Sequence, residues 1–240
     1  MKNLRRNLGT GALFILGIWG LSSCEDDTTT IRFDAIGDTY VQKIKIDDKA
    51  KYGIQHYAYA NMQISKATLT TPGNDEVTIE LKKDEDDYRR FSKVTELEDF
   101  VSEMPVDGEY TYTIISNDQD TIQSTDMLLP EEIPAVQIED FTYNQEEHSF
   151  NLSWNDIDEA DLYLVKLMEE RNGKVLFVSP KLIKSEFEFN TTSIGWLNGV
   201  TMENSKNYVL GVSAYKFENS KTQSGYDIQM ECVDYREINW

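Results

Sequence analysis

Two acidic stretches of the chain carry carboxylate and amide oxygens, which are the ligands that Ca²⁺ prefers in proteins. Residues 84–87 read Asp-Glu-Asp-Asp, and residues 117–120 read Asn-Asp-Gln-Asp. Neither stretch has the Asp-x-Asp-x-Asp-Gly order or the distal Glu of a calcium-binding loop. We interpret the first as a solvated charge run and the second as a hairpin loop, so the sequence predicts no metal site.

Candidate catalytic groups are isolated in the sequence. The two histidines, His56 and His148, have no motif around them that would form a Ser-His-Asp site, and neither lies near Cys232 with zinc-ligand spacing. A carboxylate pair for glycoside hydrolysis could be drawn from 43 acidic residues, but their abundance does not single out any two. No Gly-rich phosphate loop is present. We therefore expect a protein that is not an enzyme and carries no cofactor.

One tryptophan has the setting of a ligand-binding residue. Trp196 lies in residues 192–199, a polar stretch between two expected strands, and a loop Trp can stack on the apolar face of a sugar ring. Tyr52, Tyr57 and Tyr59 form a second aromatic group. The alternative is that Trp196 closes the end of a β-sandwich and that the tyrosines alternate through a sheet. Trp196 is the candidate ligand-binding residue that the sequence provides.

Cys24 is the residue to which we assign a covalent role. Three basic residues near the N-terminus precede an apolar run over residues 11–21, which is the layout of an export signal and is too short to span a membrane. Residues 21–24 read Leu-Ser-Ser-Cys and resemble a bacterial lipobox. The resemblance implies that residues 1–23 are a lipoprotein signal peptide and that Cys24 carries acyl chains. Each buried CH₂ contributes about 0.8 kcal/mol, so two or three chains give lasting membrane attachment.

The acidic residues 25–27, which follow Cys24, resemble the surface-export signal of Bacteroidetes lipoproteins. This resemblance implies an outer-membrane protein that faces the cell exterior, although in other bacteria such residues can retain a lipoprotein at the inner membrane. Residues 24–30 would form an acidic and Thr-rich tether.

The net charge excludes one class of partner. Residues 1–23 hold three of the 23 basic residues, so the remaining 217 residues carry a formal net charge of −23. Such a chain repels phosphate backbones, and we expect no nucleic-acid partner. With Cys24 committed to lipid, Cys232 has no disulfide partner, and its place in an alternating strand predicts a small buried side chain.

The first half of the mature chain reads as strands and turns. Residues 40–46, 77–81 and 109–114 alternate apolar and polar side chains, which is the pattern of half-buried strands. Residues 95–98 have capping-box spacing, from which we expect one short helix that ends at Pro105. These signals predict an immunoglobulin-like β-sandwich over residues 31–130.

Residues 127–134 contain two of the chain's five prolines and mark the expected boundary between two domains. Proline fixes φ and cannot donate to a strand ladder, so this connection should be extended and stiff. We expect a second β-sandwich to follow over residues 134–240.

The second domain resembles a fibronectin type III domain. Residues 152–154 match the Leu-x-Trp of that family, residues 163–165 match its Tyr-x-Val, and residues 202–208 match its tyrosine corner with Met for Leu and Asn for Pro. Residues 208–214 match the alternating run that follows the corner. The resemblance implies a fold and not an activity. The predicted fold class is thus all-β, with two tandem immunoglobulin-like and fibronectin type III-like sandwiches after the signal peptide.

The whole order of segments resembles Bacteroidetes surface lipoproteins that have an immunoglobulin-like and a fibronectin-like domain. From it we expect a lipid-anchored cell-surface protein that acts as a non-catalytic binding or adhesion module for a glycan or protein. The alternative is a structural spacer or subunit of an outer-membrane complex with no ligand of its own. A hydrolase is a third alternative. Partners would be the membrane, through Cys24, and a glycan or an envelope protein.

Overall fold

Strands dominate the structure, because period-two alternation of apolar and polar residues recurs along the chain. The computed structural model describes residues 32–47, 49–73, 77–85, 87–105, 107–129, 131–171, 173–218 and 226–240. The predicted signal peptide, Cys24 and the tether at 24–30 lie outside these residues. The described residues form strands and one short 3₁₀ segment, so the predicted all-β fold class is confirmed.

The elements of the first half of the chain are β1 (Ala35–Ile46), β2 (Lys49–Ala60), β3 (Ile64–Thr70), β4 (Thr78–Glu80), β5 (Lys82–Lys83), β6 (Arg90–Lys93), the 3₁₀ segment η1 (Leu97–Asp99), β7 (Gly108–Ser116) and β8 (Thr121–Leu128). The elements of the second half are β9 (Ile138–Asn144), β10 (Ser149–Trp154), β11 (Leu162–Met168), β12 (Val175–Val178), β13 (Glu186–Asn190), β14 (Asn207–Phe217) and β15 (Ile228–Asn239).

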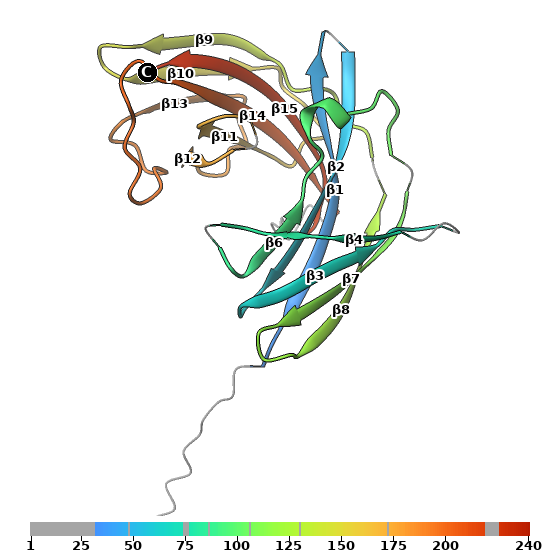
Figure 1. Cartoon of the computed structure of the whole chain (residues 1–240). Coiled ribbons are helices and arrows are strands. Elements are labelled where there is room, and N and C mark those ends of the chain that lie inside the picture. Colours follow the sequence, from blue (N-terminus) through green and yellow to red (C-terminus); the bar gives the residue numbers. More distant parts are fainter. Residues whose placement is uncertain are drawn as a thin grey trace, which may run out of the picture. The chain divides into compact units, whose positions relative to one another are not determined.

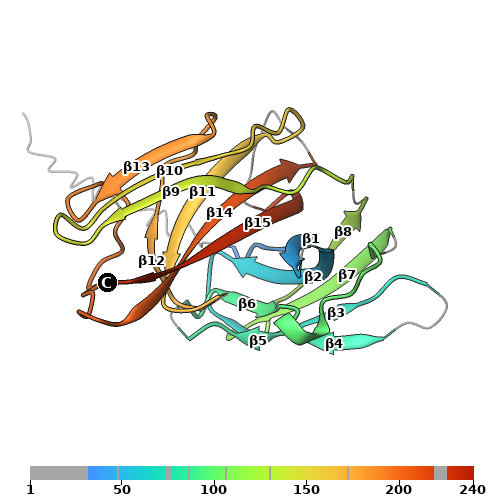
Figure 2. The same ribbon diagram turned by 90° about the horizontal axis from the view of Figure 1, so that it is seen from above.

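These strands form one large sheet and two smaller ones. The large sheet has eight strands in the order β12-β11-β14-β15-β1-β2-β6-β5. A four-stranded sheet has the order β4-β3-β7-β8, and its strands cross in front of β1 and β2 in Figure 1. A three-stranded sheet has the order β13-β10-β9 and lies over β11, β14 and β15 in Figure 2. Each small sheet packs on a part of the large one, which gives sandwich-like packing.

Strand β1 joins the two halves of the large sheet. It pairs antiparallel with β2 over its whole length and parallel with β15, where Val41 lies opposite Met230 and Ile44 opposite Val233. The remaining strand pairs that the structure describes are antiparallel, for example β14 with β15. The first strand that the structure describes therefore has the last strand as one of its two neighbours in the sheet.

The four-stranded sheet packs against the odd-numbered residues of β1. Gly37 lies under the ring of Tyr112, and a Cβ at this position would come within 2.1 Å of that ring, so only glycine fits. The Tyr112 hydroxyl donates to the carbonyl of Asp38 at 2.9 Å and forms a 2.6 Å hydrogen bond with the Thr39 hydroxyl. These contacts hold the four-stranded sheet against β1 at this point.

The three-stranded sheet covers the same face of the large sheet. Lys43 of β1 lies opposite Cys232 of β15, Cys232 opposite Ala214, and Ala214 opposite Tyr163, so the four side chains share one face. The ring of Tyr163 packs against Trp154 of the small sheet, with 5.4 Å between ring centroids. One hydrophobic cluster runs through both regions of this face. The opposite face of the large sheet is left without a covering sheet among the described residues.

The two segments that the sequence predicts as separate domains meet in this shared sheet. Residues 33–240 form one compact unit, and the connection between β8 and β9 is packed onto it. Ile133 is fully buried, and the Lys43 ammonium donates to its carbonyl at 2.9 Å and to Glu132 at 2.7 Å. The sequence predicts a stiff, extended connection and not one that packs against the sheet. It does not reveal this contact, because alternation in one strand does not show which distant strand it pairs with.

The residues that resemble fibronectin type III motifs occupy the core of the second half. Trp154 and Tyr208 are both buried, and the Tyr208 hydroxyl accepts a 2.8 Å hydrogen bond from the backbone N–H of Glu203, five residues upstream. This is the tie that a tyrosine corner makes.

The predicted helix near Thr95 is replaced by the 3₁₀ segment η1. The Thr95 hydroxyl bonds both backbone groups of Ile54 in β2, at 2.9 Å to the N–H and 2.7 Å to the carbonyl, and so is not available to cap a helix. Within the part of the chain that the structure describes, no helix has the length and apolar character needed to cross a membrane.

Candidate functional site

The uncovered face of the large sheet carries polar and aromatic side chains together with two small apolar clusters, one at Ile44 and Val233 and one at Leu162 and Phe217. Strand register places the polar and aromatic side chains together, since Gln42 lies opposite Glu231, Glu231 opposite Tyr215, and Tyr40 opposite Gln55. These polar and aromatic residues belong to five strands, and they are Tyr40, Gln42, Gln55, Tyr57, Lys166, Ser213, Tyr215, Glu231 and Tyr235.

A cleft of about 680 Å³ opens on this face. It is lined from one side by Arg90 and Ser92 of β6 and from the other by Val175 and Val178 of β12, with Glu231 at its floor. Because β6 and β12 lie toward opposite edges of the eight-stranded sheet, the sheet curls until both edges border the same cleft. Its volume is within the range of about 300–1,000 Å³ that is usual for ligand pockets.

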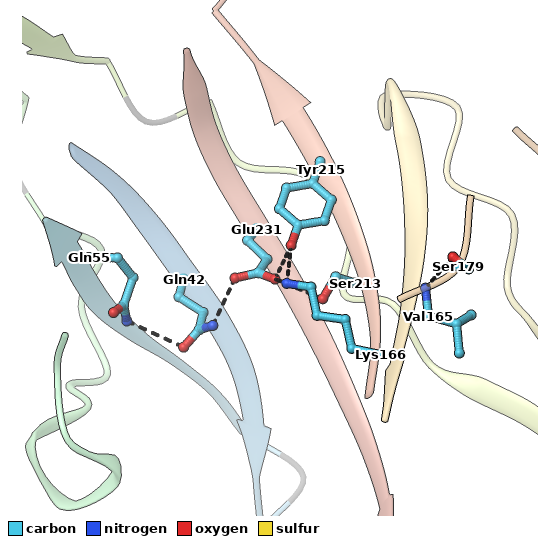
Figure 3. Close-up of polar contacts among 8 residues, drawn as sticks. All are labelled: Gln42, Gln55, Val165, Lys166, Ser179, Ser213, Tyr215 and Glu231. Carbon is cyan, nitrogen blue, oxygen red and sulfur yellow. Dashed lines mark hydrogen bonds and ion pairs between the residues drawn. The ribbon is translucent and has the colours of Figure 1, made fainter. Parts of the chain in front are cut away.

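Glu231 is the centre of the polar network on the cleft floor (Figure 3). Its Oε1 accepts hydrogen bonds from the hydroxyls of Tyr215 at 2.5 Å and Ser213 at 2.7 Å, and the Lys166 ammonium lies 3.3 Å away. The same ammonium donates to the Tyr215 hydroxyl at 2.6 Å. Only 4% of the Glu231 side chain is exposed, compared with 25% for Lys166.

The network continues across the junction between β15 and β1. Gln42 donates to Oε2 of Glu231 at 2.8 Å, and Gln55 of β2 donates to Oε1 of Gln42 at 3.3 Å. A chain of hydrogen bonds therefore links β11, β14, β15, β1 and β2 across the cleft floor, as Figure 3 shows. Because both oxygens of Glu231 are satisfied, burying its charge is tolerated.

The charge states of this network follow from its geometry. Burial alone would raise the pKa of Glu231, but the Lys166 ammonium and the hydrogen bonds from Tyr215, Ser213 and Gln42 outweigh it and hold the pKa below its usual value. Burial opposes the charge on Lys166 too, and the Glu231 carboxylate overcomes this and raises the pKa of Lys166. Burial and the neighbouring carboxylate raise the pKa of Tyr215. At neutral pH the floor thus holds a carboxylate, an ammonium and a phenol.

A row of tyrosines runs along the uncovered face from β1 into β2. The rings of Tyr40 and Tyr57 stack with centroids 5.9 Å apart, and those of Tyr57 and Tyr59 with centroids 5.8 Å apart. Tyr52, which the sequence groups with Tyr57 and Tyr59, points to the covered face and donates to Glu132 at 2.8 Å. Successive side chains of a strand point to opposite faces of the sheet. Because Tyr52 and Tyr57 are an odd number of positions apart in β2, their side chains lie on opposite faces.

Trp196 lies beside the cleft without lining it. Its indole N–H donates to the carbonyl of Asn190 at 2.9 Å, and its ring packs edge-on against Phe177, 5.3 Å away, and against Trp240, 6.1 Å away. Leu197, the next residue, does line the cleft. These contacts are those of a ring that closes the end of the covered core, which was the alternative reading of Trp196, and its role in ligand binding stays a prediction.

The histidines and Cys232 lie apart from the cleft. Burial, reinforced by Lys93, lowers the pKa of His56 to about 4, so this side chain is neutral in the folded protein. His148 stacks on Trp240 with ring centroids 4.4 Å apart. Burial raises the pKa of the Cys232 thiol to about 12, and the prediction that Cys232 is a buried side chain is confirmed.

A second group of titratable residues lies at the start of β1. Asp38 is fully buried, and its Oδ2 has no hydrogen-bond partner among the described residues, whereas Oδ1 accepts from the N–H of Ile228 at 3.3 Å. Burial and the charges of Asp126, Glu218 and Asp227 raise the pKa of Asp38 to about 9. In the described part of the chain no three His, Cys, Asp or Glu side chains are arranged to hold a metal ion.

The acidic stretches that suggested calcium have other contacts where the structure describes them. Asp84 forms an ion pair with Arg90 at the edge of the cleft, and Asp87 forms one with Arg89 at 3.2 Å. In the second stretch, the N–H groups of Asp118 and Asp120 both donate to the Ser116 hydroxyl at 3.1 Å, which is a hairpin turn.

Sequence reasoning missed the residues of the cleft floor. Lys166 is the single charge in β11, and Glu231 shares β15 with Asp234, Arg236 and Glu237. A charge in a strand normally indicates a solvent-facing side chain. The burial of Lys166 and Glu231 follows from the curl of the sheet and from the neighbouring strands, which one sequence does not reveal. The sequence did contain one signal of this burial, because Glu231 is flanked by the apolar residues Met230 and Cys232.

Comparison with known proteins gives no match to a protein-family model or to a curated protein sequence. The fibronectin type III and lipoprotein resemblances therefore rest on the residues quoted for them.

Removing either partner of the buried ion pair should destabilise the fold strongly. Glu231→Gln leaves the Lys166 ammonium without its carboxylate, and Lys166→Met leaves the buried carboxylate without its cation. Each change should cost about 3–5 kcal/mol in urea unfolding, and the double variant should cost less than the sum of the two. The control is the exposed pair Arg89 and Asp87, where Arg89→Met should cost about 0–1 kcal/mol. Equal costs at the two pairs would show that the network does not hold the sheet together.

The buried Asp38 predicts that stability falls as pH rises. The folded protein keeps a proton on Asp38 up to about pH 9, whereas the unfolded chain releases it near pH 4. The stabilisation from this proton is complete below pH 4. Between pH 4 and 9 it decreases by up to about 1.4 kcal/mol per pH unit, and it is lost once the pH has risen through 9. Asp38→Asn should flatten the decrease in melting temperature between pH 6 and 9, and Asp34→Asn, at an exposed carboxylate, should not. An unchanged slope in Asp38→Asn would contradict the prediction.

Proposed function

We propose that this chain is a lipid-anchored protein of the outer cell surface that binds a glycan in the cleft, without catalysing a reaction. The observation that carries the proposal is the combination of tyrosines and hydrogen-bonding side chains around a cleft on the uncovered, curled face of the large sheet. Tyr57 and Tyr235 line the cleft together with Gln42, Gln55 and Arg90.

This combination fits the chemistry of sugars. A pyranose ring has an apolar C–H face, which packs on aromatic rings, and a rim of hydroxyls that both donate and accept hydrogen bonds. The guanidinium of Arg90 and the ammonium of Lys166 can donate to such hydroxyls. The Lys166 side chain, one quarter exposed, reaches the cleft from the floor.

A protein partner fits the cleft less well. Stable protein interfaces bury about 800 Å² on each partner around an apolar centre. The cleft is recessed, and its floor consists of polar groups that already bond one another, such as Glu231 and Ser213. It accommodates a narrow, polar ligand better than a broad apolar surface.

The structural-spacer alternative has its own support. The network at Glu231 joins β1 to β15 through Gln42, and this alone would explain why the polar residues lie there. Binding measurements separate the two roles, because a spacer has no ligand.

The full chain, purified in detergent, should bind one class of glycan on an array. Tyr57→Ala, which removes a ring from the cleft, and Ser92→Trp, which obstructs it from β6, should each weaken binding about tenfold or more. Tyr88→Ala, at an exposed tyrosine that does not line the cleft, is the matched control and should bind normally. Circular dichroism would verify that each variant is folded.

Other outcomes would assign the site differently. Trp196→Ala should bind normally if the cleft is the site, whereas loss of binding in this variant alone would place the site in the loop. Absence of binding to all glycans, together with a stoichiometric crosslinked envelope protein in cells, would favour the spacer.

Lipid anchoring through Cys24 has a separate test. Cys24→Ala should leave the protein without acyl chains, so it should move from the detergent phase to the aqueous phase on phase separation. Export and folding should be retained, since Cys24 precedes the compact unit that begins at Phe33. A Cys24→Ala protein that remains in the detergent phase would contradict the lipobox interpretation. Protease treatment of intact cells would test the outward-facing location.

A further inference from the structure

The cleft is electrically balanced, although the chain as a whole carries a net charge of −20. Three anionic and three cationic side chains line it, namely Asp84, Glu85, Glu231, Arg90, Lys166 and Lys174. In a chain with 43 acidic and 23 basic residues, a random surface patch of this size would contain about twice as many acids as bases. The balance at the cleft is therefore a local property.

At the rim of the cleft, Asp84 holds Arg90. The Arg90 Nε donates to Oδ2 of Asp84 at 2.9 Å, and one of its terminal nitrogens donates to the same oxygen. The other carboxylate oxygen of Asp84 accepts the N–H of Asp87 at 3.1 Å. The Arg90 side chain is 42% exposed and Asp84 is 18% exposed, so the cation is the more accessible partner.

On the floor, Glu231 holds Lys166 in the same way. The ammonium is 3.3 Å from the carboxylate and 2.6 Å from the Tyr215 hydroxyl, and it lies 5.3 Å from the centre of the Tyr215 ring. Of the three cations that line the cleft, Arg90 and Lys166 are thus already bound to carboxylates of the protein, whereas Lys174 is exposed in the turn between β11 and β12.

We infer that the cleft selects uncharged glycans and rejects acidic ones, and that Asp84 and Glu231 set this selectivity by occupying Arg90 and Lys166. The inference rests on the proposed function, since it concerns the ligand of the same cleft. To pair with Arg90 or Lys166, the carboxylate of a uronic acid would have to displace a carboxylate of the protein. This exchange replaces one ion pair by another and adds no new one. The net negative charge of the chain repels such a ligand further at low ionic strength. Ring hydroxyls can accept from the same cations without displacing their partners.

The test compares matched oligosaccharides that differ only in the C6 group, such as glucans with glucuronans and galactans with galacturonans. Calorimetric titration of the full chain in detergent should give binding of a neutral oligosaccharide and at least tenfold weaker binding of its uronic-acid counterpart. Asp84→Asn releases Arg90 from a carboxylate while keeping an oxygen that can accept the N–H of Asp87. This variant should gain about tenfold in affinity for the acidic oligosaccharide, because a charge-assisted hydrogen bond becomes available. The measure of selectivity is the ratio of the two affinities, which should shift about tenfold toward the acidic oligosaccharide.

Asp87→Asn is the matched control. It makes the same substitution three residues away, removes the same charge and breaks the same kind of ion pair, with Arg89, outside the cleft. It should leave both affinities unchanged, which separates release of Arg90 from the general loss of negative charge. The gain in Asp84→Asn should also decrease with added salt.

Two results would overturn the inference while the proposed function stands. They are equal affinity of the unmodified chain for matched neutral and acidic oligosaccharides, and the same response of Asp84→Asn and Asp87→Asn to the acidic one. Absence of binding to any oligosaccharide would instead remove the proposed function, and the inference with it.

Discussion

The parallel pairing of β1 with β15 is the interaction on which the rest of the structure depends. It joins strands separated by almost the whole chain, and without it the eight-stranded sheet would divide into two smaller sheets. A pairing between such distant segments gains no help from a turn, so side chains must stabilise it. Gln42 and Glu231 face each other across this pair and bond at 2.8 Å. On the other face Lys43 lies opposite Cys232 and ties the β8–β9 connection to the sheet.

The arrangement of the sheets determines where a ligand can bind. Both smaller sheets cover one face of the large sheet, and apolar residues from all three fill the space between them. The other face keeps its tyrosines, amides and charges, and curling of the sheet turns this face into a cleft. The main hydrophobic core therefore lies behind the site. A site on strands that are packed from behind can hold its side chains in place without a lid.

The polar network has two consequences that act in opposite directions. Burying Glu231 and Lys166 removes two charges from water, which is unfavourable, and their mutual bonds offset that cost only if every member is satisfied. The same bonds fix the register of five strands, since each partner lies on a different one. A network that holds the sheet together and also lines the cleft couples the shape of the site to the integrity of the fold.

Sequence reasoning by itself determined the all-β class, most strand positions and the buried state of Cys232, because these follow from local alternation and residue size. It also located the tyrosine corner at Tyr208, because a motif of seven residues carries it. Thr95 shows where local reasoning ends, since its hydroxyl bonds a strand distant in the chain and not a helix terminus. Only the tertiary structure decided that β1 lies beside β15, that Tyr57 and Lys166 border the same cleft, and that Trp196 packs into the core. Those outcomes depend on which strands pair and how the sheet curls, and both are set by contacts between residues far apart in the chain.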